Sequence, residues 1–321
     1  MPEKIFSGIS FASKDAANVI KIITMKILVT GSNGLLGQKL SVLLQQDKNV
    51  ELIATARGKS HLDITNGQFI SLDVSDKHAV DEIFSRVKPD VVIHGAAMTQ
   101  VDQCETDREA CWKTNVDATQ YITDACIQHN THLVHVSTDF IFDGSHGPLD
   151  EEEKPNPVNY YGESKLAAEQ LIMRSHASWS ILRTVLVYGI TNDMSRSNIV
   201  LWVKNSLEQG KTIQVVNDQW RTPTLAEDLA MGCYLAAIKK AKGIYHISGK
   251  DFLTPYDIAI ATADYFNLDK SLIQATDSSK FKQPARRPAK TGFIIDKAKK
   301  DLGYEPHSFQ EGIGVLAEQI R

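Results

Sequence analysis

Cysteine is scarce in this sequence, and the few cysteines are not arranged in pairs. Cys104, Cys111, Cys126 and Cys233 are the four among 321 residues, and none has CxxC spacing. Metal sites and redox motifs usually place two cysteines within a few residues, and small secreted domains carry many more. We therefore expect reduced cysteines that pack in the interior, with no disulfide and no metal site.

A long hydrophobic run is also missing. No apolar stretch approaches the roughly 18 residues that cross a bilayer. Lys14 and Asp15 interrupt the N-terminal region where a signal peptide would need continuous apolar residues. These absences predict a cytoplasmic protein with no membrane partner.

An excess of positive charge is absent as well. The chain has 35 Lys and Arg against 39 Asp and Glu, a formal net charge of -4. Nucleic-acid-binding domains usually present a basic surface, so nucleic acid is not expected as a partner. The length suggests about two domains, and no low-complexity tract indicates disorder. We expect a globular protein with a small-molecule substrate, and a homodimer stays open.

Short apolar runs alternate with amphipathic stretches from Lys26 onward. Within each apolar run, polar and apolar residues do not alternate. Such continuous runs are typical of strands buried on both faces. They include KILVT, VELIATA, FISLDV, PDVVIHGAA, HLVHVSTD and WSILRTVLVYG. Such alternation predicts the α/β class, with right-handed crossovers and a Rossmann-like doubly wound parallel sheet.

Three regions follow from this pattern. Residues 1–24 precede the first strand as an N-terminal extension, for which a mis-assigned start, an appended arm and an extra element all remain open. Residues 25–188 are the expected dinucleotide-binding Rossmann domain. In residues 189–321 the strict alternation weakens, which indicates mainly a smaller substrate-binding lobe that covers the open edge of the sheet, with the chain crossing between lobes.

A glycine-rich turn lies between the first strand and the following helix. It reads Gly31-Ser-Asn-Gly-Leu-Leu-Gly37. Glycines there allow a tight turn, close approach of a pyrophosphate and close packing of helix on strand, while the helix N-terminus offers free N–H groups. The expected cofactor contacts are Gly31, Asn33, Gly34, Leu35, Leu36 and Gly37. The spacing departs from G-x-G-x-x-G, and such turns also occur without ligands.

No carboxylate follows the second strand, where an NAD site would offer one to the ribose 2′-hydroxyl. The residues there are TARGKS, and Arg57 could instead pair with a 2′-phosphate. This favours NADP, although NAD stays possible and Arg57 could be a solvated loop residue. Asp73 and Val74, after the third strand, are expected near the adenine, with a helix-capping aspartate as the alternative.

Tyr161 and Lys165 are four residues apart at the start of a predicted helix. This spacing puts the phenol and the ammonium on one face, where the cation can lower the phenol pKa and prepare a general acid. The preceding strand ends at Ser137, Thr138 and Asp139. Strand ends of this kind carry ligand-facing groups in open α/β sheets, although a hydroxyl bonded locally to backbone is the alternative.

Together these segments resemble the extended short-chain dehydrogenases/reductases. The resemblance is carried by the glycine turn, by HGAA ending at Ala97, by Asn115, by STDFIFDG from Ser137 and by the Tyr161-x-x-x-Lys165 pair. More narrowly, STDFIFDG, PVNYYGESKLAAE, NDQWRTPT from Asn217 and the RRPAKTGFIIDKAKKDLGYEP stretch resemble the dTDP-4-dehydrorhamnose reductase group. The resemblance covers residues 25 to about 305.

The resemblance implies a reductase with assigned residue roles. Tyr161 would donate a proton to a carbonyl oxygen while hydride arrives from the nicotinamide. Lys165 would bind the nicotinamide ribose and lower the tyrosine pKa, Thr138 would orient the carbonyl, and Asp139 would lie close by. Ala96 and Ala97 would line the cofactor site.

Three positions depart from the group's usual pattern. Phe140 replaces a tyrosine, Leu186 lies near a usual tryptophan, and Arg221 replaces a glycine. The last two put the substrate in doubt more than the reaction. The expected substrate contacts are Gln219, Trp220, Arg221 and Arg287, where Trp220 could instead be a core residue between lobes and Arg287 a surface residue.

The leading hypothesis is NADP-dependent reduction of a nucleotide-linked 4-keto-6-deoxy sugar. The alternatives are an epimerase or dehydratase of the same family, and a non-catalytic NADP-binding subunit resembling the regulatory subunit of methionine adenosyltransferase. Intact Tyr161 and Lys165 favour an enzyme. The acidic run from Asp150 to Glu153 could collect Mg²⁺, but such runs more often form solvated loops, so no metal is assigned.

Overall fold

The computed structural model describes residues 24–192 and 198–320, and the expected extension lies outside these ranges except for residue 24. Its centre is a seven-stranded parallel sheet in the order β10-β6-β5-β4-β1-β2-β3. The strands are β1 (Met25–Thr30), β2 (Val50–Ala56), β3 (Gly67–Ser71), β4 (Val91–His94), β5 (His132–Thr138), β6 (Ser178–Thr184) and β10 (Gly243–His246). The predicted α/β class and doubly wound parallel sheet are confirmed.

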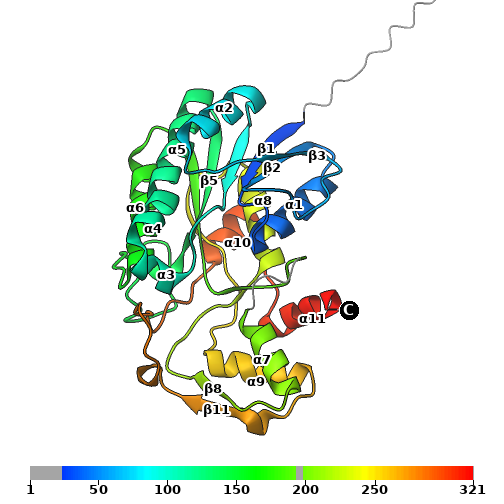
Figure 1. The fold of residues 1–321 in the computed structure, drawn as a ribbon, viewed down its shortest axis with the longest axis vertical. Coiled ribbons are helices and arrows are strands. Elements are labelled where there is room, and N and C mark those ends of the chain that lie inside the picture. Colours follow the sequence, from blue (N-terminus) through cyan, green and yellow to red (C-terminus); the bar gives the residue numbers. More distant parts are fainter. Residues whose placement is uncertain (1–23, 193–197, 321) are drawn as a thin grey trace, which may run out of the picture.

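Helices cover both faces of this sheet (Figure 1). On one face lie α1 (Leu35–Gln46), α8 (Ala226–Ile238) and α10 (Asp296–Leu302), and on the other lie α2 (Lys77–Val87), α5 (Ala118–His129) and α6 (Tyr160–Arg174). Ile27 and Val29 of β1 pack in the first layer, while Leu28 packs in the second. Burial on both faces explains why the strands read as continuous apolar runs.

The strand order reverses between β1 and β4, which pair in parallel with Thr30 opposite His94. Chains leave β1 and β4 in opposite directions at this point, so their C-terminal ends border a crevice. Short helical segments follow β4 and β5: α3 (Val101–Thr106), α4 (Arg108–Trp112), a π-helical turn (Lys113–Asp117) and a 3₁₀ turn (Asp139–Ile141). The topology thus gathers the ends of β1, β4 and β5 at one place.

The sequence predicts that the region after residue 188 covers the open edge of the sheet. In the structure, part of this region also belongs to the sheet itself. Its segment GIYH forms β10, which pairs in parallel with β6 and becomes the edge strand itself. Its helix α8 packs on α1. The sequence predicted that the chain crosses between lobes, but a four-residue apolar run has the same appearance in either part, so the pattern did not show which segment returns to the sheet.

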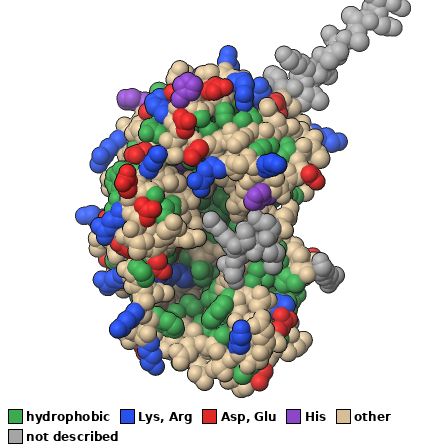
Figure 2. All heavy atoms as spheres, viewed as in Figure 1, with side chains coloured by type: hydrophobic (Ala, Val, Ile, Leu, Met, Phe, Trp, Pro, Cys, Tyr) green, Lys and Arg blue, Asp and Glu red, His purple; other side chains and the backbone are tan. Residues whose placement is uncertain are grey.

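The rest of this region forms a smaller part of the molecule. It contains α7 (Ile199–Glu208), α9 (Pro255–Tyr265), α11 (Phe309–Gln319), a pair of parallel strands, β8 (Ile213–Val216) and β11 (Ile273–Thr276), and the short pair β7 (Val187–Tyr188) and β9 (Thr224–Leu225). Its own apolar core includes Val203, Ile213 and Ala259. Figure 2 shows a hollow between the larger and smaller parts. No helix in the described ranges is long and apolar enough to cross a membrane.

Candidate active site

A cavity of about 730 Å³ opens at the C-terminal ends of the central strands. The predicted cofactor and catalytic residues all line it, although they come from six separate segments of the chain. They are Gly31, Asn33, Gly34, Leu35, Leu36, Gly37, Arg57, Asp73, Val74, Ala96, Ala97, Thr138, Asp139, Tyr161 and Lys165. The four predicted substrate residues do not line this cavity.

The glycine turn has the shape that a dinucleotide phosphate requires. Gly31 has φ +76°, and a Cβ there would lie 3.0 Å from the backbone of Ala96. A Cβ on Gly37 would lie 2.2 Å from the Gly31 carbonyl oxygen. Gly34 is exposed at the N-cap of α1, and no side chain caps this helix. The uncapped helix N-terminus is therefore available to a phosphate, and the turn fits a dinucleotide.

Asn33 ties this turn to the loop after β2. Its side-chain amide donates to the Lys59 carbonyl oxygen at 2.8 Å, and its Oδ1 accepts from the His61 N–H at 3.0 Å. Arg57 is exposed at the cavity. The loop is thereby held next to the phosphate-binding turn, the place where a ribose 2′-substituent would lie.

Asp73 stabilises a local turn and does not cap α2, whose N-cap is Asp76. The Asp73 carboxylate accepts from the N–H and the hydroxyl of Ser75. Burial raises the pKa of Asp73, but the Ser75 hydrogen bonds and the charges of Arg57 and Lys113 outweigh it, so the pKa lies below the ordinary value. Asp73 therefore stays ionised beside Arg57.

Tyr161 lies in the first turn of α6, next to the end of β5. Asn159 caps this helix by accepting from the Gly162 N–H at 2.9 Å. The Tyr161 ring is buried against Phe140, with ring centroids 5.7 Å apart. Burial raises the pKa of Tyr161 above its ordinary value, and a hydrogen bond with Thr138 opposes this rise. The phenol is thus a protonated group at neutral pH.

Lys165 is held by β5 and not by Tyr161. Its Nζ donates to the Val136 carbonyl oxygen at 2.8 Å and to His135 Nε2 at 3.1 Å. Burial lowers the pKa of Lys165 to about 8, against the opposing effect of Glu169 and Cys111. Sequence spacing missed His135, because its contact with Lys165 depends on the pairing of β5 with α6 and not on a local motif.

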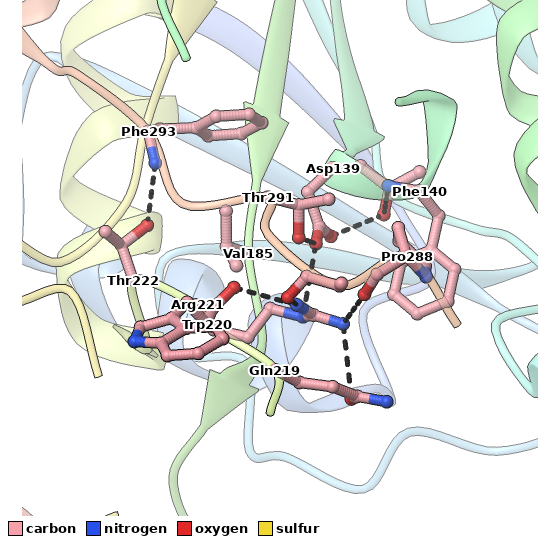
Figure 3. A network of polar contacts seen from close by, with 12 residues as sticks. Asp139, Phe140, Val185, Gln219, Trp220, Arg221, Thr222, Pro288, Thr291 and Phe293 are labelled. Atoms are coloured by element: carbon pink, nitrogen blue, oxygen red, sulfur yellow. Dashed lines mark hydrogen bonds and ion pairs between the residues drawn. The ribbon is translucent and has the colours of Figure 1, made fainter. Parts of the chain in front are cut away.

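Thr138 and Asp139 are bonded to each other at the end of β5. The Thr138 hydroxyl donates to Asp139 Oδ1 at 3.2 Å and accepts from the Phe140 N–H at 3.2 Å. Thr291, which sequence reasoning also missed, donates its hydroxyl to Asp139 Oδ2 (Figure 3). Burial raises the pKa of Asp139, while the Arg221 charge and the two hydroxyl donors oppose this rise.

The two predicted substrate arginines are engaged elsewhere. Arg221 is 5% exposed and donates to the carbonyl oxygens of Trp220, Pro288 and Ala289. Arg287 forms a bidentate ion pair with Asp102, at 2.6 and 2.7 Å. A free bidentate contact from either arginine to a pyrophosphate has no support in this geometry. Acceptors distant in sequence engage both guanidinium groups, Pro288 and Ala289 for Arg221 and Asp102 for Arg287, which the sequence pattern could not show.

Gln219 and Trp220 lie at the smaller part. Gln219 and Arg287 line a second cavity of about 760 Å³, together with Arg286. Trp220 is half-buried, its backbone bonds to Ala289 and Thr291, and Lys290 Nζ lies 4.9 Å from its ring centroid. Trp220 therefore contacts the 288–291 segment, and its side chain stays partly exposed.

The acidic run bonds within the protein. Glu151 accepts from the His246 N–H at 2.9 Å, and Glu153 lies 3.0 Å from His146. Within residues 24–192 and 198–320, no three His, Cys, Asp or Glu side chains gather as a metal site. All four cysteines are buried free thiols.

Comparison with known sequences agrees with the geometry of the site. The family model described as "RmlD substrate binding domain" matches residues 25–321. A dTDP-4-dehydrorhamnose reductase of Aggregatibacter actinomycetemcomitans is 31% identical over 300 residues, which cover 90% of this chain and 97% of the relative. Methionine adenosyltransferase 2 subunit beta of Bos taurus is 30% identical over 265 residues, 81% of this chain and 78% of that protein.

Solved structures show the same fold. A dTDP-4-dehydrorhamnose reductase ortholog from Clostridium acetobutylicum has a TM-score of 0.82 at 29% identity, covering 92% of this chain and 99% of that chain. The enzyme of that name from Bacillus anthracis str. Ames, in complex with NADP, has a TM-score of 0.80 at 25% identity, covering 92% and 100%. The chain therefore belongs to the RmlD substrate-binding-domain family, within the extended short-chain dehydrogenases/reductases.

Proposed function

We propose that this protein uses NADPH to reduce a nucleotide-linked 4-keto-6-deoxy sugar of the dTDP-4-dehydrorhamnose kind. One observation carries the proposal: Thr138, Tyr161 and Lys165 line the same cavity as the complete glycine turn. A dinucleotide on the turn and a carbonyl beside Tyr161 would therefore share one enclosed space. The reductase relative matches almost its whole length to this chain, which supports the same activity.

Reduction of a ketone needs a hydride, a proton and a donor directed at the developing alkoxide. NADPH supplies the hydride when bound. The turn from Gly31 to Gly37 and the N-terminus of α1 would hold its pyrophosphate, and Arg57 would pair with its 2′-phosphate. Lys165, already held at the end of β5, would bind the nicotinamide ribose.

Tyr161 is suited to supply the proton. The phenol, whose pKa burial raises, carries its proton at neutral pH, so the proton is present when the carbonyl oxygen gains charge. Thr138 lies beside it and would orient the carbonyl. Transfer leaves a tyrosinate, whose charge the neighbouring Lys165 ammonium would stabilise.

The similarity to methionine adenosyltransferase 2 subunit beta supports a second candidate, a non-catalytic NADP-binding subunit. That relative matches 78% of its length, and the reductase relative matches 97%. The gathering of Thr138, Tyr161 and Lys165 in the cofactor cavity gives the reductase the stronger support.

The test supplies dTDP-4-dehydrorhamnose and then other nucleotide-linked keto sugars, and follows NADPH consumption. Sustained consumption is expected, and Tyr161→Phe should lower the rate on the order of 10² to 10⁴ while NADPH binds normally. An epimerase would keep its cofactor through purification and consume no NADPH. If NADPH binds and no keto sugar is reduced, the proposal fails and the subunit candidate takes its place.

A cytoplasmic location and a homodimer remain predictions from the sequence. Cell fractionation and sedimentation equilibrium would test them. A monomer at micromolar concentration would contradict the homodimer.

A further inference from the structure

A segment from Ala285 to Thr291, here called the bridging segment, connects the smaller part of the molecule to the catalytic end of β5. The Ala285 N–H and the Arg287 guanidinium both donate to Asp102 at the start of α3. Lys290 donates its N–H to the Gly144 carbonyl oxygen at 3.0 Å. At its end, Thr291 donates to Asp139. The bridging segment therefore bonds to α3, to Gly144 in the loop after β5 and, at its end, to Asp139 in the active site.

The Arg221 guanidinium donates hydrogen bonds to the bridging segment (Figure 3). Its Nη1 donates to the carbonyl oxygens of Trp220 at 2.7 Å and Ala289 at 3.0 Å. Its Nη2 donates to the Pro288 carbonyl oxygen at 2.6 Å and to Gln219 Oε1 at 3.4 Å. A guanidinium has five N–H groups, so only the Nε–H remains. Nε lies 3.7 Å from Asp139 Oδ2.

Asp139 depends on this arginine. The carboxylate is 2% exposed, and a buried carboxylate without a cation is strongly disfavoured. Arg221 is the cation within ion-pair distance of Asp139 among the described residues, and Tyr161 on α6 is the other titratable group that acts on it. An ionised Asp139 accepts the Thr138 hydroxyl proton, and this bond holds the Thr138 side chain beside Tyr161, from where the hydroxyl would turn to a carbonyl oxygen when substrate binds.

We infer that Arg221 is a positioning residue for catalysis: it holds Asp139, and through it the Thr138 hydroxyl, and it does not bind the substrate. The inference rests on the proposed reductase function, in which Thr138 orients the carbonyl. It also assigns the bridging segment a role, since this segment bonds to Arg221 through the carbonyl oxygens of Pro288 and Ala289 and to Asp139 through Thr291. The smaller part of the molecule thus contributes to the geometry of the catalytic centre from outside the cavity.

The test compares Arg221→Gln with wild type in three measurements. The kcat should fall on the order of 10- to 100-fold, because misplacement of an orienting group slows the chemical step. The affinity for dTDP, measured by calorimetry, should change less than about threefold, since a positioning residue adds no ligand contact. Arg174→Gln, an exposed arginine at the end of α6, is the matched control and should leave both unchanged.

The pH dependence gives the third measurement. The Arg221 charge lowers the pKa of Asp139, so its removal should raise that pKa and move the acid limb of kcat to higher pH. Asp139→Asn should abolish that limb. The carboxyl ¹³C resonance of Asp139 should show the same shift between wild type and Arg221→Gln without any turnover, so this readout holds even if the proposed function fails.

Two outcomes would overturn the inference. One is a loss of dTDP affinity beyond about tenfold with an unchanged acid limb, which would make Arg221 a pyrophosphate ligand. The other outcome is measured with the double variant Asp139→Asn/Arg221→Gln. This variant removes both charges together, so it can replace Arg221→Gln if that single variant does not fold. Its kcat should equal that of Asp139→Asn, and additive losses would contradict action through Asp139.

Discussion

Burial sets the protonation of the two residues nearest to the chemistry. It raises the pKa of the Tyr161 phenol and lowers the pKa of the Lys165 ammonium to about 8. Burial disfavours the charged form of each group. The pKa of Tyr161 therefore rises, because its deprotonated form is charged, and the pKa of Lys165 falls, because its protonated form is charged. Tyr161 therefore keeps its proton across the neutral range, while Lys165 loses its own near the upper end of that range.

Lys165 should make cofactor binding dependent on pH. Its pKa is lowered to about 8, so the ammonium is nearly complete only about one pH unit or more below that value and is lost as the pH rises through about 8. NADPH affinity, measured by fluorescence titration, should therefore decline above that pH. Tyr161→Phe should retain the decline and Lys165→Met should abolish it. An unchanged decline in Lys165→Met would assign it to another group.

Arg57 should decide between the two nicotinamide cofactors. It is exposed at the cavity, next to the loop that Asn33 holds. A charge-assisted hydrogen bond contributes about 1.5–3 kcal/mol, so Arg57→Asp should lower the preference for NADPH over NADH by at least about tenfold. Lys59→Asp is the matched control in the same loop. If only the control variant changes the preference, the 2′-phosphate contact belongs to Lys59.

Site residues that lie within one helix or one turn could be predicted from the sequence. The Tyr161 and Lys165 pair lies within one helix, and the glycine turn lies between one strand and one helix, so spacing alone was informative. Arg221 and Arg287 are different. The acceptors Pro288 and Ala289 lie 67 and 68 residues from Arg221 in the sequence. The acceptor Asp102 lies 185 residues from Arg287. A sequence pattern shows the charge but not the acceptor that satisfies it.

At the scale of elements, the close approach of α1 to β1 makes the phosphate-binding turn. Gly37 permits this approach, because a Cβ there would lie 2.2 Å from the Gly31 carbonyl oxygen and 2.5 Å from the Ser32 Cα. Both are backbone atoms, so neither can move as a flexible side chain would. The helix axis and the turn are therefore fixed together.

Gly37→Ala should push α1 away from the turn. We expect a loss of about 1–3 kcal/mol in the free energy of unfolding, as for other overpacked sites, and weaker NADPH binding. Val42→Ala on the same helix is the control, because Val42 is 47% exposed and should change stability by less than about 0.5 kcal/mol. Thermal unfolding with and without NADPH measures both effects. Equal behaviour of the two variants would show that the turn tolerates the displacement.

Elements in the first part of the chain were predictable because burial on both faces gives strands a continuous apolar composition. The place of β10 in the sheet was not predictable, because GIYH has only four residues and its partner β6 is distant in sequence. Pairing of β10 with β6 is a long-range contact between residues more than 60 positions apart in sequence. Such pairing depends on the whole arrangement and leaves no local signal.

At the scale of the whole molecule, the first strand begins at Met25, and the family match begins at the same residue. We expect a chain that starts at Met25 to fold and to bind NADPH with the affinity of the full chain. Circular dichroism melting and fluorescence titration of both chains test this. A truncated chain that melts without cooperativity would show that the preceding residues belong to the folded body.

The proposed function depends on hydride transfer from NADPH to a nucleotide-linked keto sugar. NADPH carrying deuterium at the transferred position of its nicotinamide, incubated with dTDP-4-dehydrorhamnose and the enzyme, tests it most directly by mass spectrometry and NMR of the sugar. Hydride transfer should place one deuterium at C4 of the product, formed in equal amount with NADP⁺, and Tyr161→Phe should form this labelled product on the order of 10² to 10⁴ times more slowly. If NADPH binds and the sugar recovered from the reaction carries no deuterium, the proposed hydride transfer is contradicted.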